Sequence, residues 1–142
     1  MGVAGVVLLA WLVSLSVFDI RERRLPNWLT MPGAIVILTV AAAAGRGFPA
    51  LAGAVVLFTV YLAVHLLAPA AMGAGDVKLA IGVGALTGAF GIDIWTLAAV
   101  GAPLLTAAWA VVAAVRRAEP IVPHGFSMCL SAGAVTALVT FG

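Results

Sequence analysis

The sequence predicts an all-α membrane protein, with six transmembrane helices in a single domain that covers residues 1–142. The composition is the first reason, because 65% of the residues are hydrophobic and 8% are charged, whereas about a quarter are charged in a typical soluble domain. The second reason is that the apolar residues form six runs long enough for spanning helices, the form in which a backbone satisfies its own polar groups in lipid. The third is that most charges fall in the short breaks between these runs.

The first helix is expected at residues 2–18 and ends near Asp19. Its beginning has no basic segment and its end has no small-residue cleavage site, so we expect a lasting membrane helix and not a signal peptide. The second helix is expected at 28–44. Pro26 disfavours helix at the residue before it, and Asn27 can cap the helix that follows. These two helices should therefore be antiparallel neighbours joined by a tight turn.

The remaining helices are bounded by glycine, proline or charged residues and are expected at 50–69, 78–92, 94–115 and 121–141. The helix at 78–92 is short and rich in glycine. Its Gly84 and Gly88 form a small-xxx-small pattern, which we expect to pack against another helix of this chain. Asp93 is expected to cap the helix that follows.

The basic residues predict the orientation in the membrane. With six spans, the first, third and fifth breaks lie on one side, and they carry Arg21, Arg23, Arg24, Lys78, Arg116 and Arg117. The second and fourth breaks carry Arg46 alone. The side with more basic residues normally faces the cytoplasm. We therefore expect a multi-pass protein of the inner (cytoplasmic) membrane, with both termini outside the cytoplasm and with arginines that contact anionic lipid.

The same count places two aspartates on the cytoplasmic side: Asp19 at the end of the first helix and Asp76 at the start of the fourth. Asp93 falls on the opposite side. A carboxylate at a membrane boundary is costly unless it is hydrated or paired, and it is a candidate for function. If the two meet, they resist double ionisation, and one can activate a water while the other protonates a carbonyl oxygen, as in aspartic proteases. The alternative is two ordinary helix-end carboxylates, each solvated or paired with a basic residue.

Glycines surround the second aspartate in the segment GAGDVKLA (73–80). Gly73 and Gly75 would let another backbone approach closely, which at a protease site suits an extended substrate strand. The same residues also suit a helix start that is capped by Asp76. Lys78 can extend to the membrane surface or hold Asp76 in place, and the sequence favours neither.

The histidines and the cysteine suggest no metal site. His65 has no second ligand three or four residues later, so we expect an interior histidine held by a hydrogen bond. His124 lies on the cytoplasmic side, where it can border the site or, the interpretation we prefer, lie among lipid headgroups. A single cysteine, Cys129, excludes an internal disulfide and a multi-cysteine metal site. We expect no cofactor, no metal and no nucleic-acid partner.

Three segments together resemble the type IV prepilin peptidase family of membrane aspartic proteases. After Asp19, LPNWLT (25–30) is similar to the family's (I/L)-P-N-x-L-T, with leucine in place of the commoner isoleucine. GAGDVKL (73–79) matches G-x-G-D-x-K-L throughout. VPHGFSMCLSAG (122–133) resembles the beginning of the family's last helix, with His124 where an aromatic residue is more usual.

This resemblance implies an aspartic endopeptidase that removes the short basic leader from prepilin-like substrates, of the type IV, tight-adherence or pseudopilin class, at the cytoplasmic face. Asp19 and Asp76 would be its catalytic pair and would act on a water. Residues expected to support the pair are Gly73, Gly75, Lys78, Pro26 and Asn27, and residues that could contact the leader are Glu22 and His124. Many bacterial members also carry an N-terminal cytoplasmic part with paired cysteines, which this sequence lacks. The resemblance is therefore to the short, peptidase-only form, and no methyl transfer is expected.

The alternative to a peptidase is a non-enzymatic polytopic membrane protein, such as a small proton or cation transporter or a subunit of a secretion assembly. The same aspartates would then bind an ion. Such proteins usually place ionisable groups or broken helices near the bilayer midplane, often within inverted repeats. Here His65 is the one deep ionisable residue, and no repeat is visible.

Overall fold

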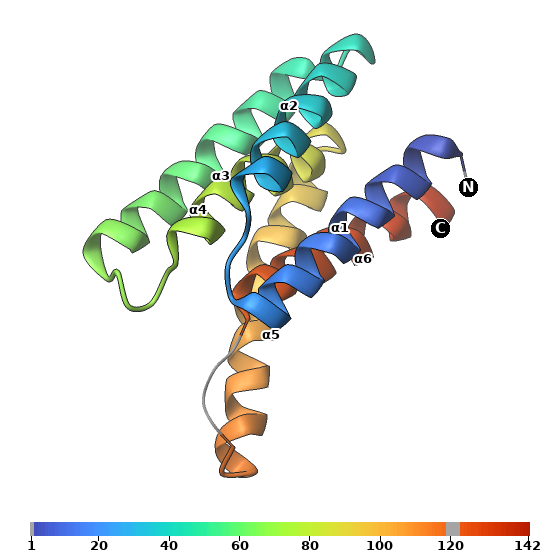
Figure 1. Ribbon diagram of the computed structural model, residues 1–142. Helices are drawn as coiled ribbons and strands as arrows, with labels where there is room; N and C mark the ends of the chain where they lie inside the picture. The colour runs from blue at the N-terminus through green and yellow to red at the C-terminus, as the bar shows by residue number, and fades with distance from the viewer. Residues whose placement is uncertain (1, 119–122) are drawn as a thin grey trace.

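The computed structural model describes residues 2–118 and 123–142, and these residues form six helices (Figure 1). They are α1 (Val3–Glu22), α2 (Asn27–Ala43), α3 (Gly47–Leu67), α4 (Ala74–Ala89), α5 (Ile92–Val115) and α6 (His124–Phe141). The predicted all-helical fold is therefore confirmed. By length and composition, α1, α3, α5 and α6 can each cross a membrane, and α2 is a shorter apolar helix. These helices indicate a multi-pass membrane protein, while the full set of six spans stays a prediction.

Two helix boundaries at the predicted site differ from expectation. α1 continues to Glu22, so Asp19 lies within its last turn and does not end it. α4 begins at Ala74, so Asp76 lies inside its first turn. Both aspartates are therefore held on helical backbone. Residues 121–122, which were expected to open the last helix, lie outside the described residues.

The expected helix caps are not formed by polar side chains. Asn27, Asp76 and Asp93 each lie inside the first turn of a helix, whereas the cap positions belong to Pro26, Gly73 and Gly91 and have no side-chain cap hydrogen bond. Proline is compatible with the extended backbone of a cap, and glycine also reaches the positive φ of 115° seen at Gly91. The polar side chains that follow are consequently free to make other contacts.

α4 is the central helix, and ten of its sixteen residues are buried. It packs against α2, α3, α5 and α6. Its closest approach is to α3, where a Cβ at Gly84 would lie 2.5 Å from the Gly53 carbonyl oxygen and one at Gly88 would lie 2.6 Å from that of Pro49. The predicted packing of the small-xxx-small pattern against a helix of the same chain is confirmed.

Trp11 fixes α1 against α2 and α4. Its ring lies over two glycines, Gly33 of α2 and Gly82 of α4, and leaves no room for a Cβ at either position. Its Nε1 donates to the Leu29 carbonyl oxygen at 2.8 Å. Since α1 otherwise packs mainly on α6, this tryptophan helps to set the position of Asp19 relative to α4.

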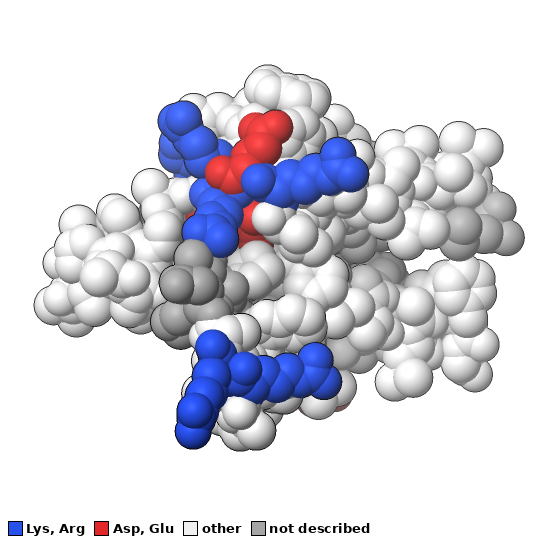
Figure 2. Space-filling view, turned by 60° about the horizontal axis from the view of Figure 1, so that its bottom comes forward, with Lys and Arg blue, Asp and Glu red and all other residues white. Residues whose placement is uncertain are grey.

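The connections between helices alternate between two ends of the molecule. The lower end in Figure 1 holds the α1–α2 connection, the α3–α4 connection and the end of α5. The opposite end holds both termini, the α2–α3 connection and the α4–α5 connection. Figure 2 looks onto the first of these ends and shows Lys and Arg side chains gathered there in two groups, with acidic side chains beside one of them. This is the alternation that six spans require, and the assignment of this end to the cytoplasm stays a prediction.

Candidate active site

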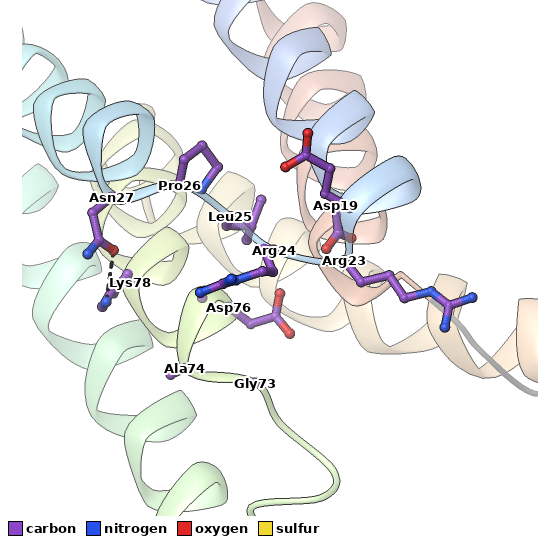
Figure 3. Close-up of a pocket in the computed structure, with 12 residues that line it drawn as sticks. Asp19, Arg23, Arg24, Leu25, Pro26, Asn27, Gly73, Ala74, Asp76 and Lys78 are labelled. Carbon is purple, nitrogen blue, oxygen red and sulfur yellow. Dashed lines mark hydrogen bonds between the residues drawn. The ribbon is translucent and has the colours of Figure 1, made fainter.

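A polar cavity of about 530 Å³ opens between the α1–α2 connection and the start of α4. Eight of the nine residues predicted for the site line it, namely Asp19, Glu22, Pro26, Asn27, Gly73, Gly75, Asp76 and Lys78. His124 is the ninth, and it does not line the cavity. In Figure 3, the Asp76 side chain is directed toward the end of α1 that carries Asp19. The fold therefore brings the two predicted aspartates to one opening.

Asp19 is held by the start of α6. The residue is buried, and the Phe126 backbone N–H donates to its Oδ2 at 2.8 Å. Phe126 lies in the first turn of α6, where backbone N–H groups have no partner within the helix and stabilise a negative charge. Gly125 makes the approach possible, because a Cβ there would lie 3.0 Å from Asp19 Cγ.

Asp76 faces the cavity from the first turn of α4, outside the four helices that can cross a membrane. Burial raises the pKa of its carboxyl group to about 7, and the negative charge of Asp19 acts in the same direction. A hydrogen bond from the Gly73 backbone opposes both effects. The protonated form of Asp76 is therefore favoured near neutral pH, and a neighbouring carboxylate adds to this effect.

Leu25, from the α1–α2 connection, packs between the start of α4 and the start of α6. It is buried, and it lies against Gly75 of α4 and Gly125 of α6. A Cβ at Gly75 would lie 3.2 Å from the Leu25 side chain, and a Cβ at Gly125 would lie 3.1 Å from it. Gly75 thus makes room for Leu25 in this structure. At Gly73, by contrast, a Cβ would meet nothing nearer than Asp76 Oδ2 at 3.6 Å, so this glycine leaves open space at the cavity.

Lys78 pairs with Asn27 and not with Asp76, while its possible extension to the membrane surface stays a prediction. Its Nζ donates to Asn27 Oδ1 at 2.8 Å, which is the dashed line in Figure 3. The bond joins the fifth residue of α4 to the first residue of α2. Lys78 and Asn27 therefore fix the two sides of the cavity relative to each other, and the Lys78 ammonium group does not neutralise Asp76 directly.

The histidines both act in hydrogen bonds inside the fold. His65 Nδ1 lies 2.6 Å from the Met72 carbonyl oxygen and ties the end of α3 to the segment that leads into α4, so its expected interior hydrogen bond is confirmed. The preferred placement of His124 among headgroups is wrong. Its ring is half-buried, with Nε2 2.9 Å from Tyr61 Oη and Nδ1 2.7 Å from Thr106 Oγ1, because polar groups of α3 and α5 face the start of α6.

The contribution of the α6 backbone was not predicted from the sequence. Gly125 and Phe126 contact Asp19 directly, whereas His124 does not. The signal in the sequence was a glycine near the start of a predicted helix. Within residues 2–118 and 123–142, no group of three or more His, Cys, Asp or Glu side chains is placed to hold a metal ion.

Comparison with known proteins agrees with the motifs. The sequence model of the type IV leader peptidase family matches residues 6–116, which include most of α1, all of α2 to α5 and both aspartates. No match was found among curated proteins or among solved structures. α6 lies beyond the matched range, although its first turn contacts Asp19. Since the match covers most of the sequence, this chain belongs to the type IV leader peptidase family.

Proposed function

We propose that this protein is a membrane aspartic endopeptidase that removes the short basic leader from prepilin-like substrates at the cytoplasmic membrane face. Its family supports a protease that acts on prepilin-type proteins. The observation that carries the assignment of the site is that Asp19 and Asp76, from α1 and α4, line one polar cavity. Those two residues would be the catalytic pair.

The surroundings of the two carboxyl groups suggest different roles. Asp19 would be the ionised member, because the Phe126 N–H donates to it. Asp76 would hold the shared proton, because its pKa is raised to about 7. In the proposed reaction Asp19 takes a proton from a water, whose oxygen attacks the carbonyl carbon of the scissile peptide bond. Asp76 gives its proton to the carbonyl oxygen.

The tetrahedral intermediate then breaks down. Asp19 passes the proton that it received to the leaving amine nitrogen, and the hydroxyl group of the intermediate returns a proton to Asp76 as the carbonyl forms again. The pair ends in the protonation state in which it began, so one water is consumed for each bond that is cut. No cation or cofactor is needed to balance these steps.

Substrate would enter from the exposed side of the cavity. Gly73 leaves open space beside Asp76, which suits the close approach of an extended substrate backbone. Glu22 is exposed at the same cavity and would pair with a basic side chain of the leader. An ion-binding transporter is less well supported, because both aspartates line one cavity at the end of α1 and the start of α4 and the family is proteolytic.

The test is co-expression with prepilin-like proteins from the same source, with leader loss measured by mass spectrometry. Asp19→Asn and Asp76→Asn should each reduce the cleavage rate by roughly 100- to 10,000-fold, the usual contribution of a general acid or base. Asp93→Asn is the matched control, because Asp93 is exposed and lies in the first turn of α5, away from the cavity. Wild-type cleavage by either dyad variant, present in the membrane at normal levels, would rule out the pair.

A further inference from the structure

We propose that His124 is a positioning residue for Asp19: its hydrogen bonds to α3 and α5 fix the first turn of α6, and that turn holds the Asp19 carboxylate. His124 does not line the cavity and would not touch substrate. The inference rests on the proposed function for its kinetic consequence, whereas its structural consequence can be measured without any substrate.

The donors and acceptors around His124 can be assigned so that each bond has one of each. Thr106 Oγ1 donates to the Ala102 carbonyl oxygen at 3.1 Å, so its own oxygen is left to accept from His124 Nδ1 at 2.7 Å. A neutral imidazole that carries its proton on Nδ1 accepts at Nε2. Tyr61 therefore donates its O–H to His124 Nε2, at 2.9 Å. Every polar atom in this chain of bonds has a partner, and the chain joins α3, α6 and α5.

The same turn of α6 reaches Asp19 two residues later. The Phe126 N–H donates to Asp19 Oδ2 at 2.8 Å, and the intervening Gly125 is in close contact with the carboxyl group. The cap residue Pro123 makes no side-chain hydrogen bond that would fix this end of the helix. The side-chain hydrogen bonds that hold the first residue of α6 are thus those of His124. A shift of that turn would be passed on to the Phe126 N–H, and so to Asp19.

A merely stabilising role can be separated from positioning with a control on the same pair of helices. Ser131 Oγ donates to the Ala98 carbonyl oxygen at 3.1 Å, so it also joins α6 to α5, two turns further along α6. Ser131→Ala removes one bond between the same helices and leaves the first turn of α6 untouched. If the bonds of His124 served general stability alone, the two positions would respond alike.

The kinetic test compares His124→Ala, Tyr61→Phe and Thr106→Val with Ser131→Ala on a cleavable prepilin-like substrate. The first three should lower kcat by roughly 10- to 100-fold, the scale expected for a misplaced catalytic group. Their KM should stay within about twofold of wild type, because the interaction lost is one that acts in the transition state. His124→Asn, which can still donate to Thr106, should recover part of kcat, and Ser131→Ala should stay close to wild type.

The structural test uses protein labelled with ¹⁵N-phenylalanine, which gives amide signals for six residues. A backbone N–H that donates to a carboxylate resonates downfield. The Phe126 signal should therefore move upfield in Asp19→Asn, which removes the charged acceptor. It should move in the same direction in His124→Ala and in Tyr61→Phe, and it should not move in Ser131→Ala.

Failure of the positioning proposal and failure of the proposed peptidase function give different results in these two tests. A Phe126 amide that stays in place in both His124→Ala and Tyr61→Phe would overturn the proposal, as would an equal loss of kcat in Ser131→Ala. If the amide moves as expected while wild-type protein cleaves no prepilin-like substrate, the positioning contact stands and the proposed peptidase function fails. Cleavage that is lost in His124→Ala but partly restored in His124→Asn supports both.

Discussion

At the scale of single residues, the two aspartates are supported mainly by backbone groups. The Phe126 N–H donates to Asp19, and the Gly73 backbone contacts Asp76. Lys78, the nearest basic residue to Asp76 in the sequence, donates instead to Asn27. Backbone donors stabilise a carboxylate without adding a positive charge, so the repulsion between two carboxylates persists. A proton on Asp76 would relieve it, and this is the state from which the proposed reaction begins.

The raised pKa of Asp76 predicts a pH dependence of stability. Its ordinary value is 3.8 and its value in the fold is about 7, so between these values the folded protein binds more protons than the unfolded chain. Stability should therefore fall as pH rises from about 4 to about 7, and then level off. Asp76→Asn imitates the protonated form and should flatten this part of the curve. Thermal unfolding in detergent at a series of pH values measures it, and an unchanged slope in Asp76→Asn would contradict the assignment.

The close contact at Gly125 predicts a second effect at the site. A Cβ there would lie 3.0 Å from Asp19 Cγ and 3.1 Å from Leu25 Cδ1, so Gly125→Ala should displace the carboxyl group. We expect the rate of leader cleavage to fall by about 100-fold, as for other small displacements of catalytic groups. Gly133→Ala is the control on the same helix, because its Cβ would make an ordinary contact of 3.5 Å with Leu12. Equal rates for these two variants would show that the contact is unimportant.

At the scale of helices, the sequence predicted the elements better than their ends. Long apolar runs identify helices because a helix satisfies its backbone polar groups within its own segment in lipid. The ends depend on which side chains find partners. Asn27 lies inside α2, where its side-chain oxygen accepts from Lys78. α1 runs past Asp19, whose carboxylate accepts an N–H of α6.

The approach of α6 to Asp19 could not be predicted from sequence. Asp19 and Phe126 are separated by 107 positions, and no local pattern specifies which helix start will meet which side chain. The alternation of breaks did predict that Asp19 and Asp76 share one end of the molecule. Counting spans is enough to place residues at the same depth, but the contacts between them depend on how helices pack side by side.

The packing of α4 against α3 predicts a stability effect. Replacing a helical glycine by alanine normally favours the helix by up to about 1 kcal/mol. At Gly84 the added Cβ would lie 2.5 Å from the Gly53 carbonyl oxygen, so Gly84→Ala should instead destabilise the protein by roughly 1–3 kcal/mol through overpacking. Gly133→Ala gains the same helix propensity without the clash. The two melting temperatures in detergent should therefore move in opposite directions, and a rise for Gly84→Ala would refute the close contact.

At the scale of the whole molecule, the central position of α4 accounts for how two distant motifs form one site. α4 carries Asp76 at one end and packs against α2, α3, α5 and α6 along its length, so its first turn is fixed in place at the cavity. α1 brings Asp19 to the same end, where α6 supplies the N–H that holds it. The site thus belongs to one end of the bundle, and access to it depends on which side of the membrane that end faces.

The orientation is the last prediction, and it follows from the basic residues. The end of the molecule that carries the cavity also carries Arg24, while Arg46 lies at the opposite end beside the α4–α5 connection, where it donates to the Ala89 carbonyl oxygen. Both arginines are exposed, so each can be replaced by a cysteine in a Cys129→Ser background. If the basic end faces the cytoplasm, a thiol reagent that cannot cross the membrane should label Arg46→Cys in intact cells. Arg24→Cys should be labelled after permeabilisation alone. Labelling of Arg24→Cys in intact cells would place the cavity outside the cytoplasm. A leader that has not yet crossed the membrane could not reach it there. That result would therefore count against the proposed peptidase as well as the orientation.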